Sequence, residues 1–294
     1  MSGSPNLAEV ATVTQRLAVL LAAGVAPASA WGHVAASTDS QIARRVATGV
    51  DLAAAAGGTT GLQREAWQGL AAAWSVATEC GSPLAPALRD YAVSLRDLGD
   101  AQRDAQVALA GPVATARMVM MLPAVGVLFG LALGFNTLGT LVGTPIGWGC
   151  LVVGGSLLVL AARWNRRLVA AARPVRATPG LACELTAIGM AGGASLDRTR
   201  SIVDSALVQF GIEPEGHVDE VLRLSRAAGV PAAELLRAEA VELRAAARAM
   251  ARERAAALAV KLMLPLGLCV LPAFLALGVV PLLVTVISST VRSF

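Results

Sequence analysis

Histidine and cysteine are scarce in this 294-residue chain, which limits the catalytic chemistry available to it. The two histidines, His33 and His217, have no Cys, Ser or carboxylate partner at a spacing typical of nucleophilic or acid–base catalysis. The cysteines are too far apart for a Cys-x-x-Cys site, so we expect buried, reduced thiols. They are Cys80, Cys150, Cys183 and Cys269. We therefore predict no catalytic residue, no metal site and no cofactor.

Arginine is the charged residue with the most regular spacing. A long helix is predicted at 84–110, where Arg-Asp pairs recur every seven residues. A second long helix, predicted at 232–260, carries arginines four residues apart on one face, a repulsive spacing that favours an acidic neighbour in this protein or another. Two interpretations stay open: solvated helices with weak surface ion pairs, or faces that contact a charged partner. The candidate partner contacts are Arg89, Arg96, Arg103, Arg237, Arg244 and Arg248.

The elements that would position these rows continue into membrane-like sequence. Residues 118–162 contain no Asp, Glu, Lys, Arg or His. A bilayer core of about 30 Å takes about 20 helical residues, so we predict spans at 118–138 and 145–163 with a turn between them. Residues 262–291 are also uncharged and predict a third span. Its prolines predict kinks at Pro265, Pro272 and Pro281.

Three glycines four residues apart lie in the first predicted span. They are Gly126, Gly130 and Gly134. A stripe without Cβ atoms lets another helix pack closely, and we propose these residues as helix-packing positions in the membrane. The alternative is the ordinary glycine enrichment of membrane helices.

The composition favours an all-α membrane protein. The chain is 55% hydrophobic with a mean hydropathy of +0.64, too apolar for a typical soluble domain. Alanine-rich sequence without period-two alternation favours helix over strand. Basic residues follow the second span, the positive-inside pattern, so we expect a multi-pass protein of the inner (cytoplasmic) cell membrane with its N-terminus in the cytoplasm. They are Arg163, Arg166, Arg167, Arg173 and Arg176. Without interleaved aromatic residues they favour the lipid bilayer over nucleic acid.

The two halves of the chain share sequence features in the same order. Gly-x-Pro and a later Leu-Arg recur at 81–89 and 229–237, and Met-Leu-Pro recurs at 121–123 and 263–265. The segments 17–28 and 185–196 also align, with Gly24 on Gly192. We predict an internal duplication of a helical unit and its following span. The predicted domains are cytoplasmic helical units at 1–117 and 164–260, a transmembrane hairpin at 118–163 and a C-terminal transmembrane helix at 261–294.

Local signals predict the shorter elements. Ser37–Ser40 supplies capping residues for a helix at 41–56. Gly81 ends a helix at 62–79. Gly111-Pro112 is predicted to break the first long helix directly before the first span.

This arrangement resembles the type II secretion system F-domain proteins (GspF, TadB and TadC), the inner-membrane platform proteins of secretion systems and type IV pili. The sequence looks like the tight-adherence (Tad) branch, which builds Flp pili. The residues that carry the resemblance are Ala114–Pro123, Gly143–Gly147, Trp164–Leu168 and Pro265–Pro272. Many Tad relatives have spans before the first cytoplasmic unit, whereas this chain begins within that unit, so a TadB or a TadC role stays open.

The resemblance implies a non-enzymatic platform for pilus assembly or type II-like secretion. Its helical units would contact a cytoplasmic secretion ATPase, and its spans would receive pilin subunits. An oligomer is expected, and a second F-domain protein is a further expected partner. The alternatives are a small-molecule transporter or permease component and a signalling scaffold. A transporter usually needs ionisable groups within its spans, and the predicted spans offer only Asn136, a few Thr and Ser, and glycine.

Overall fold

The computed structural model describes residues 7–132, 139, 142–171, 178–214, 216–281, 283–284 and 287, and within these ranges the chain is helical with no strand. It divides into two compact units. Unit 1 comprises residues 1–102 and 174–250, and unit 2 comprises residues 103–173 and 251–294. Two long helices, α6 (Leu84–Ala132) and α12 (Ala232–Lys261), contribute residues to both units.

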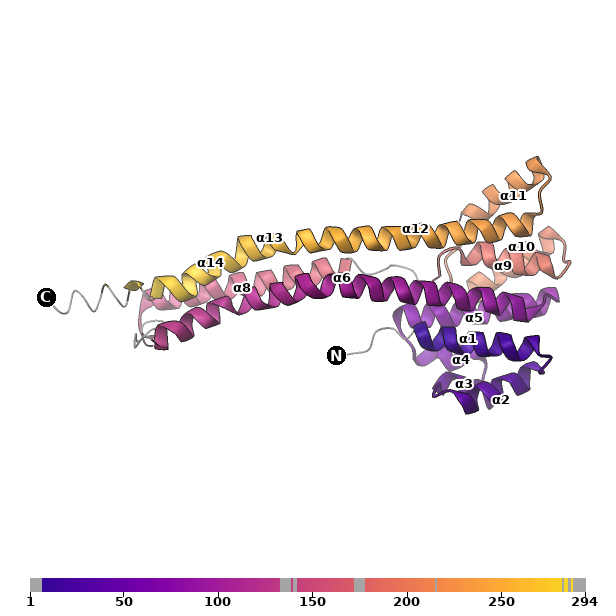
Figure 1. Ribbon diagram of the computed structural model, residues 1–294, viewed down its shortest axis with the longest axis horizontal. Helices are drawn as coiled ribbons and strands as arrows, with labels where there is room; N and C mark the ends of the chain where they lie inside the picture. The colour runs from indigo at the N-terminus through magenta and orange to yellow at the C-terminus, as the bar shows by residue number, and fades with distance from the viewer. Residues whose placement is uncertain are drawn as a thin grey trace. The chain divides into compact units, whose positions relative to one another are not determined.

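The first part of unit 1 is a bundle of helices that precede α6 (Figure 1). They are α1 (Leu7–Ala22), α2 (Pro27–Ser37), α3 (Gln41–Ala47), α4 (Leu52–Ala55), the 3-10 turn η1 (Ala56–Gly58) and α5 (Gly61–Cys80). Trp67 at the centre of α5 and Tyr91 on α6 are among the largest fully buried side chains. Their burial fixes α5 against the beginning of α6.

The helix predicted at 41–56 is two helices, α3 and α4. Gly49 has φ +93° and turns the chain between them, a conformation that few residues other than glycine adopt. The Asp51 carboxylate then accepts hydrogen bonds from the amides of Ala53 and Ala54 and caps α4. The single-helix prediction was wrong because it did not recognise this turn and its second cap.

The second part of unit 1 consists of helices that follow unit 2 in the sequence. They are α9 (Leu181–Ala191), α10 (Leu196–Gln209), α11 (His217–Ala228) and the beginning of α12. Every residue of α9 from Leu181 to Gly189 is buried. One hydrophobic core contains residues between 7 and 98 together with residues between 181 and 210. Two segments that are distant in the sequence therefore form a single hydrophobic core.

Glycines allow the helices of unit 1 to approach closely. A Cβ atom at Gly180 would lie 2.8 Å from Cα of Ala240 on α12. A Cβ atom at Gly192 would overlap the carbonyl oxygen of Cys80 at the end of α5. Beside that contact, the Ser82 hydroxyl donates a 2.6 Å hydrogen bond to the Ile188 carbonyl. These contacts join α9 to α12 on one side and to the α5–α6 turn on the other.

Unit 2 contains the apolar helices. It holds the remainder of α6, α8 (Pro145–Ala171), the end of α12, α13 (Met263–Pro265), the π-helical turn η2 (Leu266–Val270), α14 (Leu271–Phe274) and the π-helical turn η3 (Leu275–Val279). The predicted break at Gly111-Pro112 was wrong, because α6 continues through it. Gly111 has no Cβ atom to clash with the following proline ring, and its carbonyl accepts a hydrogen bond from the Thr115 hydroxyl.

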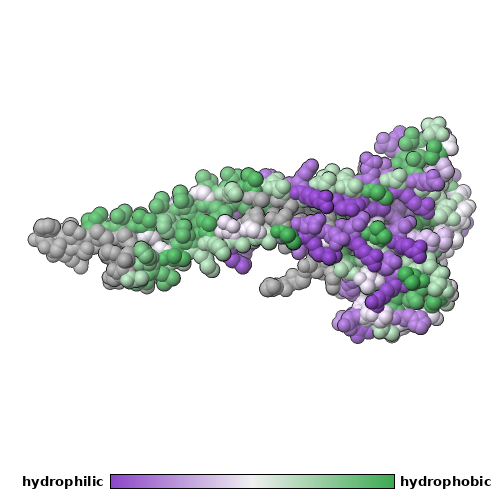
Figure 2. Space-filling view, viewed as in Figure 1, coloured by the Kyte–Doolittle hydropathy of each residue, from purple (hydrophilic) through white to green (hydrophobic). Residues whose placement is uncertain are grey.

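Large apolar side chains of unit 2 are exposed on all of its long helices. Examples are Met118 and Phe129 on α6, Val152 and Leu160 on α8, and Leu268 after α13. Figure 2 shows hydrophobic residues gathered over the segments of α8, α13 and α14. In water such surface would be unfavourable, and an apolar solvent removes that cost.

Two helical runs are long and apolar enough to cross a membrane. They are Pro145–Ala170, which corresponds to the second predicted span, and Ala232–Val279, which contains the beginning of the third. The apolar helix Arg117–Ala132 is shorter, and the rest of the first predicted span, 133–138, lies outside the described residues. At Pro265 and Pro272 the third segment widens into adjoining π-helical turns, consistent with the amide that each proline lacks.

Candidate functional site

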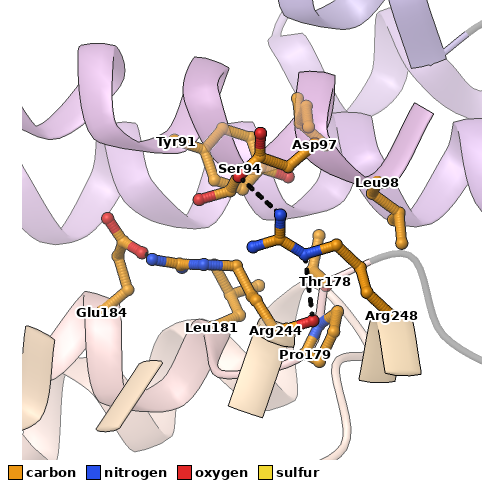
Figure 3. A pocket seen from close by; sticks show the side chains of 11 residues that line it. Tyr91, Ser94, Asp97, Leu98, Thr178, Pro179, Leu181, Glu184, Arg244 and Arg248 are labelled. Carbon is orange, nitrogen blue, oxygen red and sulfur yellow. Dashed lines mark hydrogen bonds and ion pairs between the residues drawn. The ribbon is translucent and has the colours of Figure 1, made fainter. Parts of the chain in front are cut away.

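The most polar interior position of unit 1 is an ion pair between α9 and α12. The Arg244 guanidinium donates a hydrogen bond to a Glu184 carboxylate oxygen, and the two side chains are only 15% and 6% exposed. Figure 3 shows the Arg244 side chain extended toward Glu184. The acidic neighbour that the arginine spacing of this helix favours is therefore supplied, at Arg244, by the chain itself.

A second arginine extends this network to α6. Arg248 Nη1 lies 3.3 Å from an Asp97 carboxylate oxygen, and Arg248 Nε donates a 3.3 Å hydrogen bond to the Arg244 carbonyl (Figure 3). These groups line a small pocket with Tyr91 and Leu181, and its volume of about 20 Å³ leaves room for about one water molecule. The pocket is thus too small for an organic substrate. The charged residues that line it form an ionic contact between α6, α9 and α12.

Burial dominates the electrostatics of this contact. It raises the pKa of Glu184 above its ordinary value, and the nearby positive charge of Arg244 opposes that rise. Burial also raises the pKa of Tyr91 well above its usual range, so the phenol stays protonated and donates a 2.7 Å hydrogen bond to the Ala66 carbonyl. The polar groups of this site are engaged with one another, which suits a structural role.

The other candidate partner contacts lie at the surface. Arg89, Arg96 and Arg237 are exposed in unit 1, where we find no ion pair to any of them within the described parts of the chain. Arg103 is exposed in unit 2 and does make an interaction there. Of the six arginines, Arg244 and Arg248 bind acidic residues of this chain. Arg89, Arg96 and Arg237 face solvent, and Arg103 belongs to neither group.

Unit 2 has its own ion pair between the two long helices. Arg252 Nη2 lies 3.5 Å from an Asp104 carboxylate oxygen, with both side chains largely exposed. The Arg-Asp repeat of α6 therefore supplies acceptors to α12 at Asp97 and at Asp104. The sequence contained a signal for these pairs, because α6 has a regular row of aspartates and α12 has a regular row of arginines. It did not show that the two rows contact each other.

The proposed glycine stripe lies at a helix contact where it can be described. A Cβ atom at Gly126 would approach within 3.0 Å of the Phe274 ring and 3.7 Å of Cα of Gly278. Gly130 is buried, and Gly134 lies outside the described residues. Sequence reasoning missed Gly154 of α8, where a Cβ atom would overlap Leu277. The Gly154-Gly155 pair was the available signal.

The residues considered for chemistry lie apart. Cys80, Cys183 and Cys269 are buried, Cys150 is partly buried, and burial raises the pKa of the Cys80 thiol. Within the described residues no group of three His, Cys, Asp or Glu side chains is placed to hold a metal ion. His217 Nδ1 lies 3.4 Å from a Glu239 carboxylate oxygen at the surface of unit 1.

Comparison with known proteins gives this geometry a context. Residues 13–132, from α1 to the end of α6, match the family model for the type II secretion system (T2SS), protein F. Neither the curated proteins nor the solved structures yielded a match. Residues 13–132 are thus similar to the F domain, the domain of a family of secretion and pilus-assembly platforms. With the two apolar helical runs, this similarity indicates a membrane protein.

Proposed function

We propose that this protein is a non-enzymatic platform in the inner cell membrane for pilus assembly or type II-like secretion. The observation that carries the proposal is the F-domain match over residues 13–132, in a chain whose unit 2 exposes apolar side chains along its helices. The buried Glu184–Arg244 pair joins α9 to α12 within unit 1.

Three membrane spans agree best with the exposed surface of unit 2. The end of α6 exposes Met118, Met121, Val125, Leu128 and Phe129 over more than two turns. An isolated apolar helix surface of this kind is stable in lipid and unfavourable in water. The end of α6 therefore belongs in the bilayer with α8 and the third segment, which it contacts through Gly126.

Matching turns support an internal duplication of the helical unit. Gly24 has φ +83° two residues after α1 ends, and Gly193 has φ +78° two residues after α9 ends. Gly81 and Gly229 both have φ +68° and end α5 and α11. The turns align Gly24 with Gly193, one residue from the position that the sequence alignment suggested. On this alignment the region of α3 and α4 has no counterpart in the second copy.

A cytoplasmic secretion ATPase is the proposed partner of unit 1, because this chain offers no nucleotide-binding motif of its own. The exposed arginines Arg89, Arg96 and Arg237 are the candidate contacts. Pilin subunits of a Tad/Flp pilus are the proposed partners of unit 2, and a second F-domain protein completes the proposed oligomer. ATP hydrolysis by the ATPase would supply the energy to move pilins out of the bilayer.

The test is co-purification of the detergent-solubilised full chain with the secretion ATPase of the same organism, with and without ATP. We expect nucleotide-sensitive capture, weakened at least about tenfold when Arg89, Arg96 and Arg237 are replaced by Glu, since each reversal opposes a charge-assisted contact. The matched control replaces Arg64, Arg223 and Arg226, which are also exposed in unit 1, by Glu. An equal loss of ATPase capture in both triple variants would show that Arg89, Arg96 and Arg237 are not specific contacts of the ATPase. Failure of wild-type capture, with flux of a solute in proteoliposomes, would replace the platform by a transporter.

A further inference from the structure

The positive charge of this protein is concentrated in the unit that contains the apolar helices. The chain has 24 Lys and Arg and 20 Asp and Glu. Unit 2 holds ten of the basic residues and two of the acidic ones, which leaves fourteen and eighteen in unit 1. Unit 2 therefore carries a formal charge of +8 and unit 1 a charge of −4.

Three cations of unit 2 lie at one level beside its apolar segments. Val119 of α6, Trp164 of α8 and Leu266 after α13 pack against the same small cluster, formed by Ala161, Cys269 and Val270. Those three positions therefore lie side by side. Arg117, Arg163 and Lys261 are within five residues of them along their own helices. A bilayer that covered the apolar segments would bring this level to its headgroup region.

An open hollow lies at this level on α8. Its lining residues are Val159, Ala162, Arg163, Arg166 and Arg167, and its volume is about 610 Å³. The three arginines fall within about one helical turn, where like charges repel one another. Within the described residues of unit 2 no carboxylate pairs with any of them. The hollow is thus positively charged on one side and apolar at Val159, which is 56% exposed.

We propose that this hollow binds the phosphate headgroup of an anionic phospholipid. Guanidinium groups donate paired hydrogen bonds to phosphate oxygens, and a phosphate would relieve the repulsion among the three arginines. The acyl chains would lie along the exposed apolar face of α8, which includes Val152, Val159 and Leu160. Basic pockets beside membrane helices bind such headgroups in general. The inference requires that α8 spans the bilayer, and it does not depend on a role in secretion.

Native mass spectrometry of the detergent-solubilised full chain tests the site. The protein is mixed with equal amounts of phosphatidylglycerol and phosphatidylcholine that have identical acyl chains, and the ratio of the two bound lipids is measured. We expect wild type to favour phosphatidylglycerol. Replacing Arg163, Arg166 and Arg167 by Gln should lower that ratio at least about tenfold, since each arginine near an anionic lipid contributes about a fivefold preference. An unchanged ratio in this variant would overturn the proposal.

Two matched variants separate the site from net charge. Arg64, Arg223 and Arg226 replaced by Gln remove the same charge from unit 1, and we expect the wild-type lipid ratio. A parallel loss there would show a preference for any positive protein and overturn the proposal. Arg163, Arg166 and Arg167 replaced by Lys keep the charge and should keep most of the preference. This variant also decides the matter if the Gln variant fails to fold, because a folded Lys variant without any preference would contradict a phosphate site.

Competition with a soluble phosphate compound tests whether the hollow binds a lipid or a free anion. Glycerol phosphate in tenfold excess over phosphatidylglycerol should leave most of the lipid bound, because the acyl chains add apolar burial on α8 that the soluble compound lacks. Complete displacement of the lipid would assign the hollow to a free phosphate and overturn the lipid proposal.

Discussion

At the scale of single residues, burial explains why two arginines of one row behave differently. Arg244 reaches a carboxylate that is almost fully buried, whereas Arg248 pairs with an Asp97 side chain that is 39% exposed. Removing one partner of a buried pair leaves an uncompensated charge away from water, whereas the partners of a half-buried pair remain in contact with water. The same residue type at a four-residue spacing thus has two energetic roles.

Replacing Arg244 by Gln should lower the free energy of unfolding of unit 1 by about 3–5 kcal/mol, because Glu184 would stay buried without its counter-ion. Replacing Arg248 by Gln should lower it by about 1 kcal/mol or less. Chemical unfolding in detergent, followed by tryptophan fluorescence, measures both values. Equal losses in the two variants would show that burial of Glu184 does not control the pair.

The pH dependence of stability should also carry a contribution from Glu184. Burial raises its pKa in the folded state above the ordinary 4.5, so the folded protein holds this proton more tightly than the unfolded chain does. The resulting stabilisation is present below pH 4.5 and is lost as the pH rises through the folded-state pKa. The unfolding free energy of wild type minus that of Glu184→Gln should therefore fall as the pH rises above 4.5. A difference that rises instead would mean that Arg244 outweighs burial.

At the scale of helices, glycine decides which faces of unit 2 come into contact. Gly154 and Gly155 are neighbours on α8, but only a Cβ atom at Gly154 would overlap another helix, through Leu277, while Gly155 has nothing within 4 Å. The pair offers a matched comparison in one helix turn, with the same gain in helix propensity at both positions.

Gly154→Ala should lower the thermal unfolding temperature of the detergent-solubilised protein, with a cost of about 1–3 kcal/mol, because Leu277 must move or α8 must shift. Gly155→Ala should leave that temperature unchanged or raise it slightly. Circular dichroism during heating provides the measurement. Indistinguishable curves for the two variants would contradict close packing of α8 against η3.

Sequence patterns predicted helices more successfully than they predicted contacts. The period of apolar residues and the capping signals located α5, α12 and the beginning of α6 to within a few residues. They failed at Gly111-Pro112, because a proline after glycine avoids part of the clash that ends helices. They also left the partners of Arg244 and Arg248 open, since Glu184 and Asp97 lie 60 and about 150 residues away in sequence. Nothing local in a sequence reports a pairing at such a distance.

At the scale of the whole molecule, the two units carry net charges of opposite sign. The apolar helices lie in the unit with charge +8, whereas unit 1 is acidic by four charges. Cations beside membrane helices favour the cytoplasmic side of the bilayer. We therefore expect the flanking arginines, and both helical parts of unit 1, on that side.

Cysteine labelling tests this orientation. In a variant whose native cysteines are replaced by alanine, Ser205→Cys, on the exposed face of α10, should resist a membrane-impermeant maleimide in right-side-out vesicles and react in inverted ones. Gly139→Cys, between the first two predicted spans, should show the opposite behaviour. Labelling of Ser205→Cys from the outside would contradict a cytoplasmic unit 1.

The widened turns of the third apolar segment have a consequence for how its length can vary. A π-helical turn closes its hydrogen bond over one residue more than an α-helical turn does, so η2 and η3 each hold an additional residue. A single deletion in either turn could restore α geometry locally and leave Phe274 or Gly278 directed at Gly126. In α8, which is α-helical from Pro145 to Ala171, the same deletion would rotate every later side chain by about 100°. Among related chains, differences of one residue in length should therefore collect after Pro265 and Pro272, and α8 should keep its length.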